Sequence, residues 1–572
     1  MPSRRSFMAI SGGSIAAAAL SSVAFGQTPA SSTPIVETSV GRIRGRMVGR
    51  IHAFKGVPYG ASTAGAGRFL PPSKPQPWTG VRDAFELGLR CPQQQAQLVP
   101  EFGLMDRREP MGEDCLCLNV WTAGVGDGRK RPVMVWLHGG GFTGGSAGFD
   151  VYDGANLAAK HDVVLVGVNH RLNIFGFLYL ADLGNDKYAQ ASNAGMLDIV
   201  AALQWVRDNI ERFGGDSNNV TVFGQSGGGS KVSTLLGMPA AKGLFQKAIA
   251  QSGSQVTSVS KSDAAESALA LLSRLGLKAN QLDDLQKMPM EQLLALAAGN
   301  GAESLRVVPR PVEGRQAQAA PGDSRGGGRG GANPPNAPLR LSPVADGRTI
   351  PTNIFDPVAT EISSNVPLMI GSTETEVTWN TQTYYDPLDD AALHARVRQT
   401  LQRADEAAVD RVIAIYRKNR PKAGNLDLYL ILASDASNFR TGTDTEADRK
   451  AAQGKAPVYK YYFQWYSPVR EGKLRSMHTM DIAFAFDNVD IARTEIGTGP
   501  ERQPLADRMA RAWVAFARTG NPSHLGLPAW PAYTIPQRAT MVFNNDCLVV
   551  NNPYGEEKAA LAGATPARAT AG

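Results

Sequence analysis

The segment Asn219–Ser230 constrains the fold of this chain more than any other stretch. It starts as a short run of β-forming residues and then breaks into the pattern Gly-x-Ser-x-Gly, centred on Ser226. In this pattern a strand turns sharply into a helix and lifts the serine hydroxyl above the sheet. The two flanking glycines are needed because a Cβ atom there would clash with the turn. The same letters also occur in flexible loops, so the surrounding sequence must decide between the two interpretations.

The surrounding segments alternate between strand and helix patterns. Buried-type strands are expected at Pro132–Leu137 and Val163–Val168, and a helix is expected over Ala194–Phe213. This alternation predicts an α/β fold with a mostly parallel sheet and helices on both faces. Other expected elements are a hairpin over 34–48, strands at 113–121, 247–251, 366–370 and 458–465, and helices within 262–300 and at 512–518.

A serine nucleophile needs a base that takes its proton and an acid that orients the base. In chains with this type of turn the order is Ser, then Asp or Glu, then His, and three histidines follow Ser226. His394 lies in a polar helix pattern and is expected to face solvent. His478 lies in a loop that leads into an apolar segment, which favours it as the base, with His524 as the runner-up.

The acid is expected at the end of the strand over 366–370, where two carboxylates follow. Either Glu374 or Glu376 would serve, and the pattern alone leaves both open. A glycine run at 139–141 follows another buried-type strand. Such a run exposes backbone N–H groups, which could stabilise an oxyanion.

The N-terminus carries a targeting pattern. Ser3-Arg-Arg-Ser-Phe7 is a twin-arginine signature, followed by a short apolar stretch and by small residues before Gln27. We therefore expect residues 1–26 to be a signal peptide read by the twin-arginine export machinery, and the mature protein to be periplasmic or secreted. The apolar stretch is short and interrupted by Ser and Gly, so no membrane anchor is expected after its removal.

Composition excludes some other classes. The formal net charge is +7 with scattered arginines, which gives no reason to expect a nucleic-acid partner.

We expect one domain over 27–555 with a low-complexity, disordered insertion at about 313–338, and a loose tail over 556–572. Four cysteines allow three full pairings, which spacing does not distinguish. No histidine or cysteine spacing suggests a metal site.

Taken together, the motifs resemble those of the type-B carboxylesterases, the cholinesterase-like family of α/β hydrolases. The resemblance covers roughly residues 33–545. Its marks begin with the segments Phe54-Lys-Gly-Val-Pro-Tyr, Arg68-Phe, Glu113-Asp-Cys-Leu-Cys-Leu-Asn, His138-Gly-Gly-Gly-Phe and Asn169-His-Arg-Leu. They continue with Asn193-Ala-Gly-Met-Leu-Asp, Phe213-Gly-Gly-Asp, Gly224-Gln-Ser-Gly-Gly and Pro343-Val-Ala-Asp-Gly. The resemblance implies the α/β-hydrolase fold and a hydrolase that needs no cofactor.

The resemblance also selects among the candidate residues. In the family the catalytic glutamate closes a Gly-x-x-x-Asp-Glu-Gly segment, which selects Glu376, although Thr375 and Val377 replace the flanking Asp and Gly. It likewise supports His478. The family's oxyanion hole corresponds to the N–H groups of Gly140, Gly141 and Gly227.

Comparison with the family's motifs also shows two differences beside the serine, and it implies a disulfide and two ion pairs. Family members often have Glu and Ala on either side of the serine, where this chain has Gln225 and Gly227. The resemblance implies a disulfide between Cys91 and Cys115 and leaves Cys117 and Cys547 unassigned. It also implies two buried ion pairs, Arg68 with Glu113 and Arg171 with Asp198.

The function expected from the sequence is an exported carboxylesterase acting on a small-molecule ester. The same chemistry cleaves amides and carbamates, so these remain alternatives. Some cholinesterase-like domains are non-catalytic binding modules, but they usually lack a member of the triad. The identity of the ester depends on loops such as 379–385, whose shape one sequence does not give.

Overall fold

The structure is a computed structural model that describes residues 32–94, 110–183, 186–301, 339–378, 387–402 and 404–564. Its centre is one sheet that has 13 strands among the described residues. The strands are β1 Ser32–Glu37, β2 Arg42–Val48, β3 Ile51–Pro58, β4 Val81–Asp83, β5 Cys117–Thr122, β6 Arg131–Leu137, β7 Val164–Val168, β8 Gly215–Gln225, β9 Lys247–Gln251, β10 Leu368–Thr373, β11 Val458–Phe463, β12 Ala539–Phe543 and β13 Leu548–Asn551.

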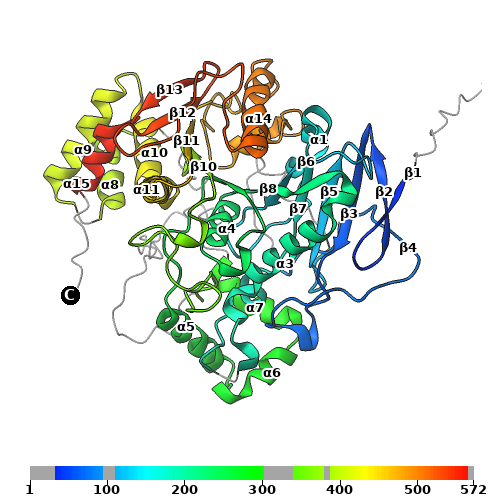
Figure 1. The fold of residues 1–572 in the computed structure, drawn as a ribbon. Helices are drawn as coiled ribbons and strands as arrows, with labels where there is room; N and C mark the ends of the chain where they lie inside the picture. The colour runs from blue at the N-terminus through cyan, green and yellow to red at the C-terminus, as the bar shows by residue number, and fades with distance from the viewer. Residues whose placement is uncertain are drawn as a thin grey trace, which may run out of the picture.

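The strand order is β1-β2-β3-β5-β7-β6-β8-β9-β10-β11-β12-β13, and β4 pairs with β2. Along this order all pairs from β7 to β12 are parallel, whereas the pairs from β1 to β7 and the pair β12–β13 are antiparallel; the side pair β2–β4 is parallel. Figure 1 shows the early strands β1 to β4 at one end of the sheet and β12 and β13 at the other. The predicted mostly parallel sheet is therefore confirmed in its centre.

Helices cover both faces of this sheet. They are α1 Ala155–His161, α2 Asn173–Phe177, α3 Ala194–Asn209, α4 Gly227–Leu236, α5 Lys261–Arg274, α6 Leu282–Lys287, α7 Met290–Gly301, α8 Asp390–Thr400, α9 Glu406–Asn419, α10 Asn425–Ala436, α11 Asn438–Ala452, α12 Met480–Ala485, α13 Arg493–Ile496, α14 Arg502–Thr519 and α15 Gly555–Ala564. Short 3-10 turns join several of them.

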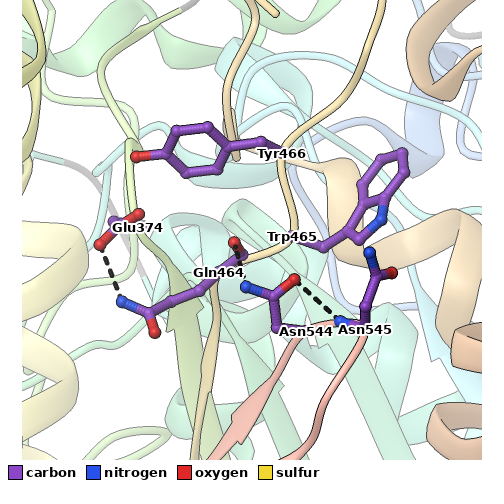
Figure 2. A pocket seen from close by; sticks show the side chains of 6 residues that line it. All are labelled: Glu374, Gln464, Trp465, Tyr466, Asn544 and Asn545. Carbon is purple, nitrogen blue, oxygen red and sulfur yellow. Dashed lines mark hydrogen bonds between the residues drawn. The ribbon is translucent and has the colours of Figure 1, made fainter.

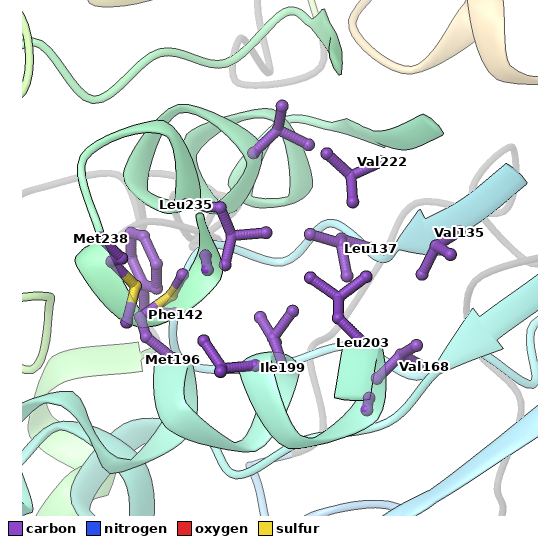
Figure 3. Packing of buried hydrophobic residues seen from close by; sticks show 14 of the residues in the cluster. Val135, Leu137, Phe142, Val168, Met196, Ile199, Leu203, Val222, Leu235 and Met238 are labelled. Carbon is purple, nitrogen blue, oxygen red and sulfur yellow. The ribbon is translucent and has the colours of Figure 1, made fainter. Parts of the chain in front are cut away.

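The fully buried strand β6 shows why both faces need covering. Its side chains alternate, so Val135 and Leu137 enter the core shared with α3 and α4, and Trp136 enters the core shared with α12 and α14. Figure 3 shows the first of these cores, where Leu203 of α3 and Leu235 of α4 lie against the sheet residues. A continuous apolar strand of this kind is typical of a sheet that is buried on both faces.

Two expectations about local structure are wrong. The strand expected from Glu113 begins only at Cys117, and all of β5 is buried instead of alternating between buried and exposed. The tail expected to be loose from residue 556 forms α15 over Gly555–Ala564, which packs on α9 through Leu561 and Ala564. Residues 565–572, the signal-peptide region 1–26 and the insertion at 313–338 lie outside the described residues.

Most of the other expected elements are confirmed. Strands β1 and β2 form the predicted antiparallel hairpin. The helix expected from Ala194 is α3, and it ends in a 3-10 turn that Gly214 closes at φ 74°. Within the described residues, no helix combines the length and the apolar character needed to cross a membrane.

Candidate active site

Ser226 stands alone between β8 and α4, with φ 58° and ψ −125°. This backbone conformation is strained for a residue with a side chain. It is held by the neighbouring glycines: a Cβ on Gly228 would lie 2.0 Å from the carbonyl oxygen of Leu137, and one on Gly224 would lie 2.6 Å from the backbone of Gly228. The Ser226 N–H also donates to the carbonyl of Gln251 at 2.8 Å. The predicted strand–turn–helix is therefore present, and its glycines are sterically required.

His478 and Glu376 are joined at the carboxyl ends of β10 and β11. The Nδ1 atom of His478 lies 2.5 Å from Oε2 of Glu376, and Glu376 has no exposed surface. Burial alone would raise the pKa of Glu376, but the contacts with His478 and Ser252 outweigh it and leave the pKa below its usual value. The carboxylate is therefore held in its charged form beside the imidazole.

Two further donors fix the other oxygen of this carboxylate. Oε1 of Glu376 accepts a hydrogen bond from the hydroxyl of Ser252 at 2.7 Å and another from the N–H of Thr373 at 2.8 Å. Ser252 follows β9, so it stands at the same edge of the sheet as the other site residues. Ser252 was not among the residues expected from the sequence, and its position directly after a buried-type strand is the signal that could have indicated it.

Gln225 connects the serine turn with the histidine. Its Nε2 atom lies 3.4 Å from both ring nitrogens of His478. Because Gln225 directly precedes Ser226, this contact brings the turn and the imidazole together. The ring of Phe439 also packs against the imidazole, with the two ring centroids 4.4 Å apart.

Glu374, the alternative acid, faces a different space. Its Oε1 atom accepts a hydrogen bond from Nε2 of Gln464 at 2.8 Å, and both residues line a cavity of about 390 Å³ (Figure 2). Trp465, Tyr466 and two asparagines complete the lining. Glu374 and Glu376 thus point to different surroundings, and it is Glu376 that contacts His478.

The two alternative histidines also lie elsewhere. His394 is in α8, where its Nε2 atom is 3.2 Å from Asp410 and 3.4 Å from Glu406. His524 lies in a loop, and its Nε2 atom is 2.9 Å from the carbonyl oxygen of Arg508. Of the three histidines after Ser226, the structure brings His478 to the candidate acid.

The glycine run after β6 approaches the serine turn closely. Gly140 and Gly141 have φ values of 89° and 60°, in the region that favours glycine. Gly227 is the first residue of α4, and a Cβ there would lie 2.3 Å from the carbonyl oxygen of Gly141. The structure thus places the candidate donors Gly141 and Gly227 against each other, at a helix N-terminus where negative charge is favoured.

The predicted cysteine pair and ion pairs have different outcomes. Cys91 and Cys115 are free thiols here, and a hydrogen bond to Cys91 together with burial raises the pKa of Cys115 well above its usual value. The two are neighbours, but a disulfide between them stays a prediction. Both predicted ion pairs are present and buried: Arg68 binds Glu113 through Nε at 2.7 Å, and Arg171 binds Asp198 at 2.8 and 2.6 Å.

The model of the carboxylesterase family matches residues 32–561. The chain belongs to the carboxylesterase family. This confirms the resemblance seen in the motifs, and it confirms at family level the prediction of a carboxylic-ester hydrolase. Within the part of the chain that the structure describes, no group of His, Cys, Asp or Glu could hold a metal ion.

Relatives within the carboxylesterase family match almost the whole chain. The para-nitrobenzyl esterase of Bacillus subtilis is 34% identical over 536 residues, which are 92% of this chain and 98% of that protein. The phenmedipham hydrolase of Pseudarthrobacter oxydans is 31% identical over 526 residues, which are 90% of this chain and 95% of that protein. Among solved structures, a carboxylesterase of Geobacillus stearothermophilus at pH 6.2 is 35% identical with a TM-score of 0.74, covering 92% of this chain and 100% of that one. The α/β-hydrolase fold is thereby confirmed.

Proposed function

We propose that this carboxylesterase is an exported serine hydrolase that cleaves carboxylic esters through an acyl-enzyme intermediate. The observation that carries the proposal is the 2.5 Å contact between the buried carboxylate of Glu376 and Nδ1 of His478. Gln225, directly before the strained Ser226, lies 3.4 Å from the same imidazole. Ser226, Glu376 and His478 have the chain order expected of a catalytic triad on this type of turn.

In the proposed reaction, Ser226 attacks the ester carbonyl while Nε2 of His478 takes the hydroxyl proton. Glu376 accepts the Nδ1–H hydrogen bond, which fixes the tautomer and stabilises the imidazolium. The N–H groups of Gly140, Gly141 and Gly227 stabilise the tetrahedral oxyanion. His478 then protonates the leaving alcohol as the C–O bond breaks. Water attacks the acyl-enzyme in the same way and releases the carboxylic acid and free Ser226.

Covalent labelling tests the catalytic role of the serine directly. A fluorophosphonate should bind one site per chain, and peptide mass spectrometry should place the label on Ser226, because the imidazole activates that hydroxyl. The Ser226→Ala variant serves as the blank. A folded protein that takes up no label would contradict the proposal and would favour a non-catalytic binding module, whereas a label on another serine would contradict the assignment of Ser226 as the nucleophile.

The preferred bond is decided by matched substrates. An ester, an amide and a carbamate with the same acyl or alcohol group would be compared by kcat/KM. We expect the ester to be cleaved fastest, because alkoxides leave more readily than amines. A higher kcat/KM for the amide or carbamate would move the assignment to that class, on the same triad.

Export is proposed from the Ser3-Arg-Arg-Ser-Phe7 segment and the small residues before Gln27. In a bacterial host with the twin-arginine route, the protein should be recovered from the periplasm or medium with an N-terminus at or near Gln27. Replacing both arginines by lysine should keep the chain in the cytoplasm uncleaved, because that machinery reads the arginine pair. An intact N-terminus on active wild-type protein in the cytoplasm would overturn this part.

A further inference from the structure

Lys231 is a buried cationic side chain that the proposed reaction does not use. It lies on α4, five residues after Ser226, and has no exposed surface. Among the described residues, its one hydrogen bond runs from Nζ to the carbonyl oxygen of His138 at 2.9 Å. It has no carboxylate partner there, and burial lowers its pKa to about 7.

An amine in this position is costly for the fold. Burying a lysine without an acidic partner destabilises a protein relative to an apolar side chain of similar size. The groups that face Lys231 do not compensate for this. The rings of His138 and His170 stack with their centroids 4.9 Å apart. Burial is the largest cause that lowers the pKa of each imidazole well below its usual value, and the positive charge of Lys231 is the second. Both imidazoles are therefore neutral, and stability does not explain the lysine.

The contacts of Lys231 bracket the glycine run of the candidate oxyanion hole. His138, whose carbonyl accepts the Nζ hydrogen bond, directly precedes the run, and the ring of Phe142, 5.8 Å from Nζ, directly follows it. Between them, Gly140 and Gly141 have positive φ values, and the Gly140 carbonyl accepts hydrogen bonds from the N–H groups of Thr143 and Gly144 within the loop itself. One side chain on the nucleophile's own helix thus touches both ends of the loop.

We propose that Lys231 is a positioning residue: it ties the loop of Gly139, Gly140 and Gly141 to the helix that begins after Ser226. The tie fixes the oxyanion donors relative to the attacking serine. Catalysis by such donors depends on their being in place before charge develops, so a loosened loop lowers kcat more than it raises KM. This inference rests on the proposed ester hydrolysis.

The test is the Lys231→Met variant, which keeps an unbranched side chain one atom shorter but removes the donor. With p-nitrophenyl acetate, kcat should fall at least about tenfold with KM changed less than about twofold, a part of the roughly 100-fold loss typical of a deleted oxyanion donor. The melting temperature should stay equal or rise, because a buried charge is removed. Activity that falls while stability holds is the signature of positioning and not of a structural role.

The matched control is Lys450→Met. Lys450 lies on α11 and is also buried. Its Nζ donates hydrogen bonds to the backbone carbonyls of Ser363 and Ser364 at 2.7 and 3.0 Å. Its kcat should equal that of the wild type. If Lys231→Met does not fold, Lys231→Gln and Lys231→Ala are compared by kcat per phosphonate-titrated site, and the glutamine variant, which keeps an N–H donor, should retain more activity than the alanine variant.

Two results would overturn the inference. One is a folded Lys231→Met protein with wild-type kcat, and the other is a loss of activity that only follows a fall in melting temperature. Both differ from failure of the proposed function. A wild-type protein that hydrolyses no ester would contradict the proposed function itself, whereas an active wild type with an equally active Lys231→Met variant would contradict only the role of Lys231.

Discussion

Replacing Ser226 by alanine is expected to lower kcat for p-nitrophenyl ester hydrolysis by about 10⁶-fold, the size of loss found when a serine nucleophile is removed from a triad. The oxyanion donors and the binding site would remain, so a small residual rate above that in water is expected. The fold should not change, because alanine has the same backbone restrictions as serine at φ 58°. The measurements are initial rates and the melting temperature.

Ser230→Ala is the matched control for this variant. Ser230 lies on the same helix, and its hydroxyl donates to the carbonyl of Ser254 at 3.1 Å, away from the proposed reacting atoms. It should keep wild-type kcat. A Ser226→Ala protein, free of contaminating esterase, that hydrolyses ester at the rate of this control would disprove the mechanism.

The second large effect is expected from Glu376→Gln. This substitution preserves shape but removes the charge that stabilises the imidazolium. The amide oxygen would stay with the donors of Ser252 and Thr373, so the amide NH2 would face Nδ1 and favour the wrong tautomer of His478. A comparable change in a serine triad lowers kcat by about 10⁴-fold, and we expect a loss of that order. KM should change little, because Glu376 is buried behind His478.

A matched control makes this result specific. Glu374→Gln, the same change two residues earlier, should leave kcat near the wild-type value, because Glu374 bonds Gln464 at another cavity. Equal losses in both glutamine variants would contradict the assignment of Glu376.

Ser252→Ala removes one donor to the Glu376 carboxylate and should lower kcat by about tenfold or less. That donor lowers the pKa of Glu376, so its loss should move the acidic limb of the rate profile to higher pH.

The elements that local sequence governs were predictable. The turn at Ser226 follows from a β-forming run that meets glycines, and the buried strands β6 and β7 follow from their continuous apolar residues. Each of these signals spans about a dozen residues or fewer, so a single sequence contains it in full. Helix α15 was missed because its composition is a weak signal, and its stability comes from packing on α9.

The site was predictable only as a set of candidates. Glu374 and Glu376 follow the same strand, and nothing in their neighbourhood says which one meets His478. The family resemblance selected Glu376, and this is the one of the two that contacts His478. Ser252 and Glu376 are 124 residues apart in the chain, and Lys231 and His138 are 93 apart. Such pairs are created when the strand ends converge, and no local pattern encodes them.

The close approach of Gly227 to Gly141 has a consequence for how this site can evolve. The resemblance to the family implies that alanine often follows the serine, yet at position 227 its methyl group would lie 2.3 Å from the carbonyl oxygen of Gly141. The two positions are therefore epistatic: alanine can enter only if the glycine run moves outward. A chain that combines this loop with an alanine at position 227 would therefore carry the clash.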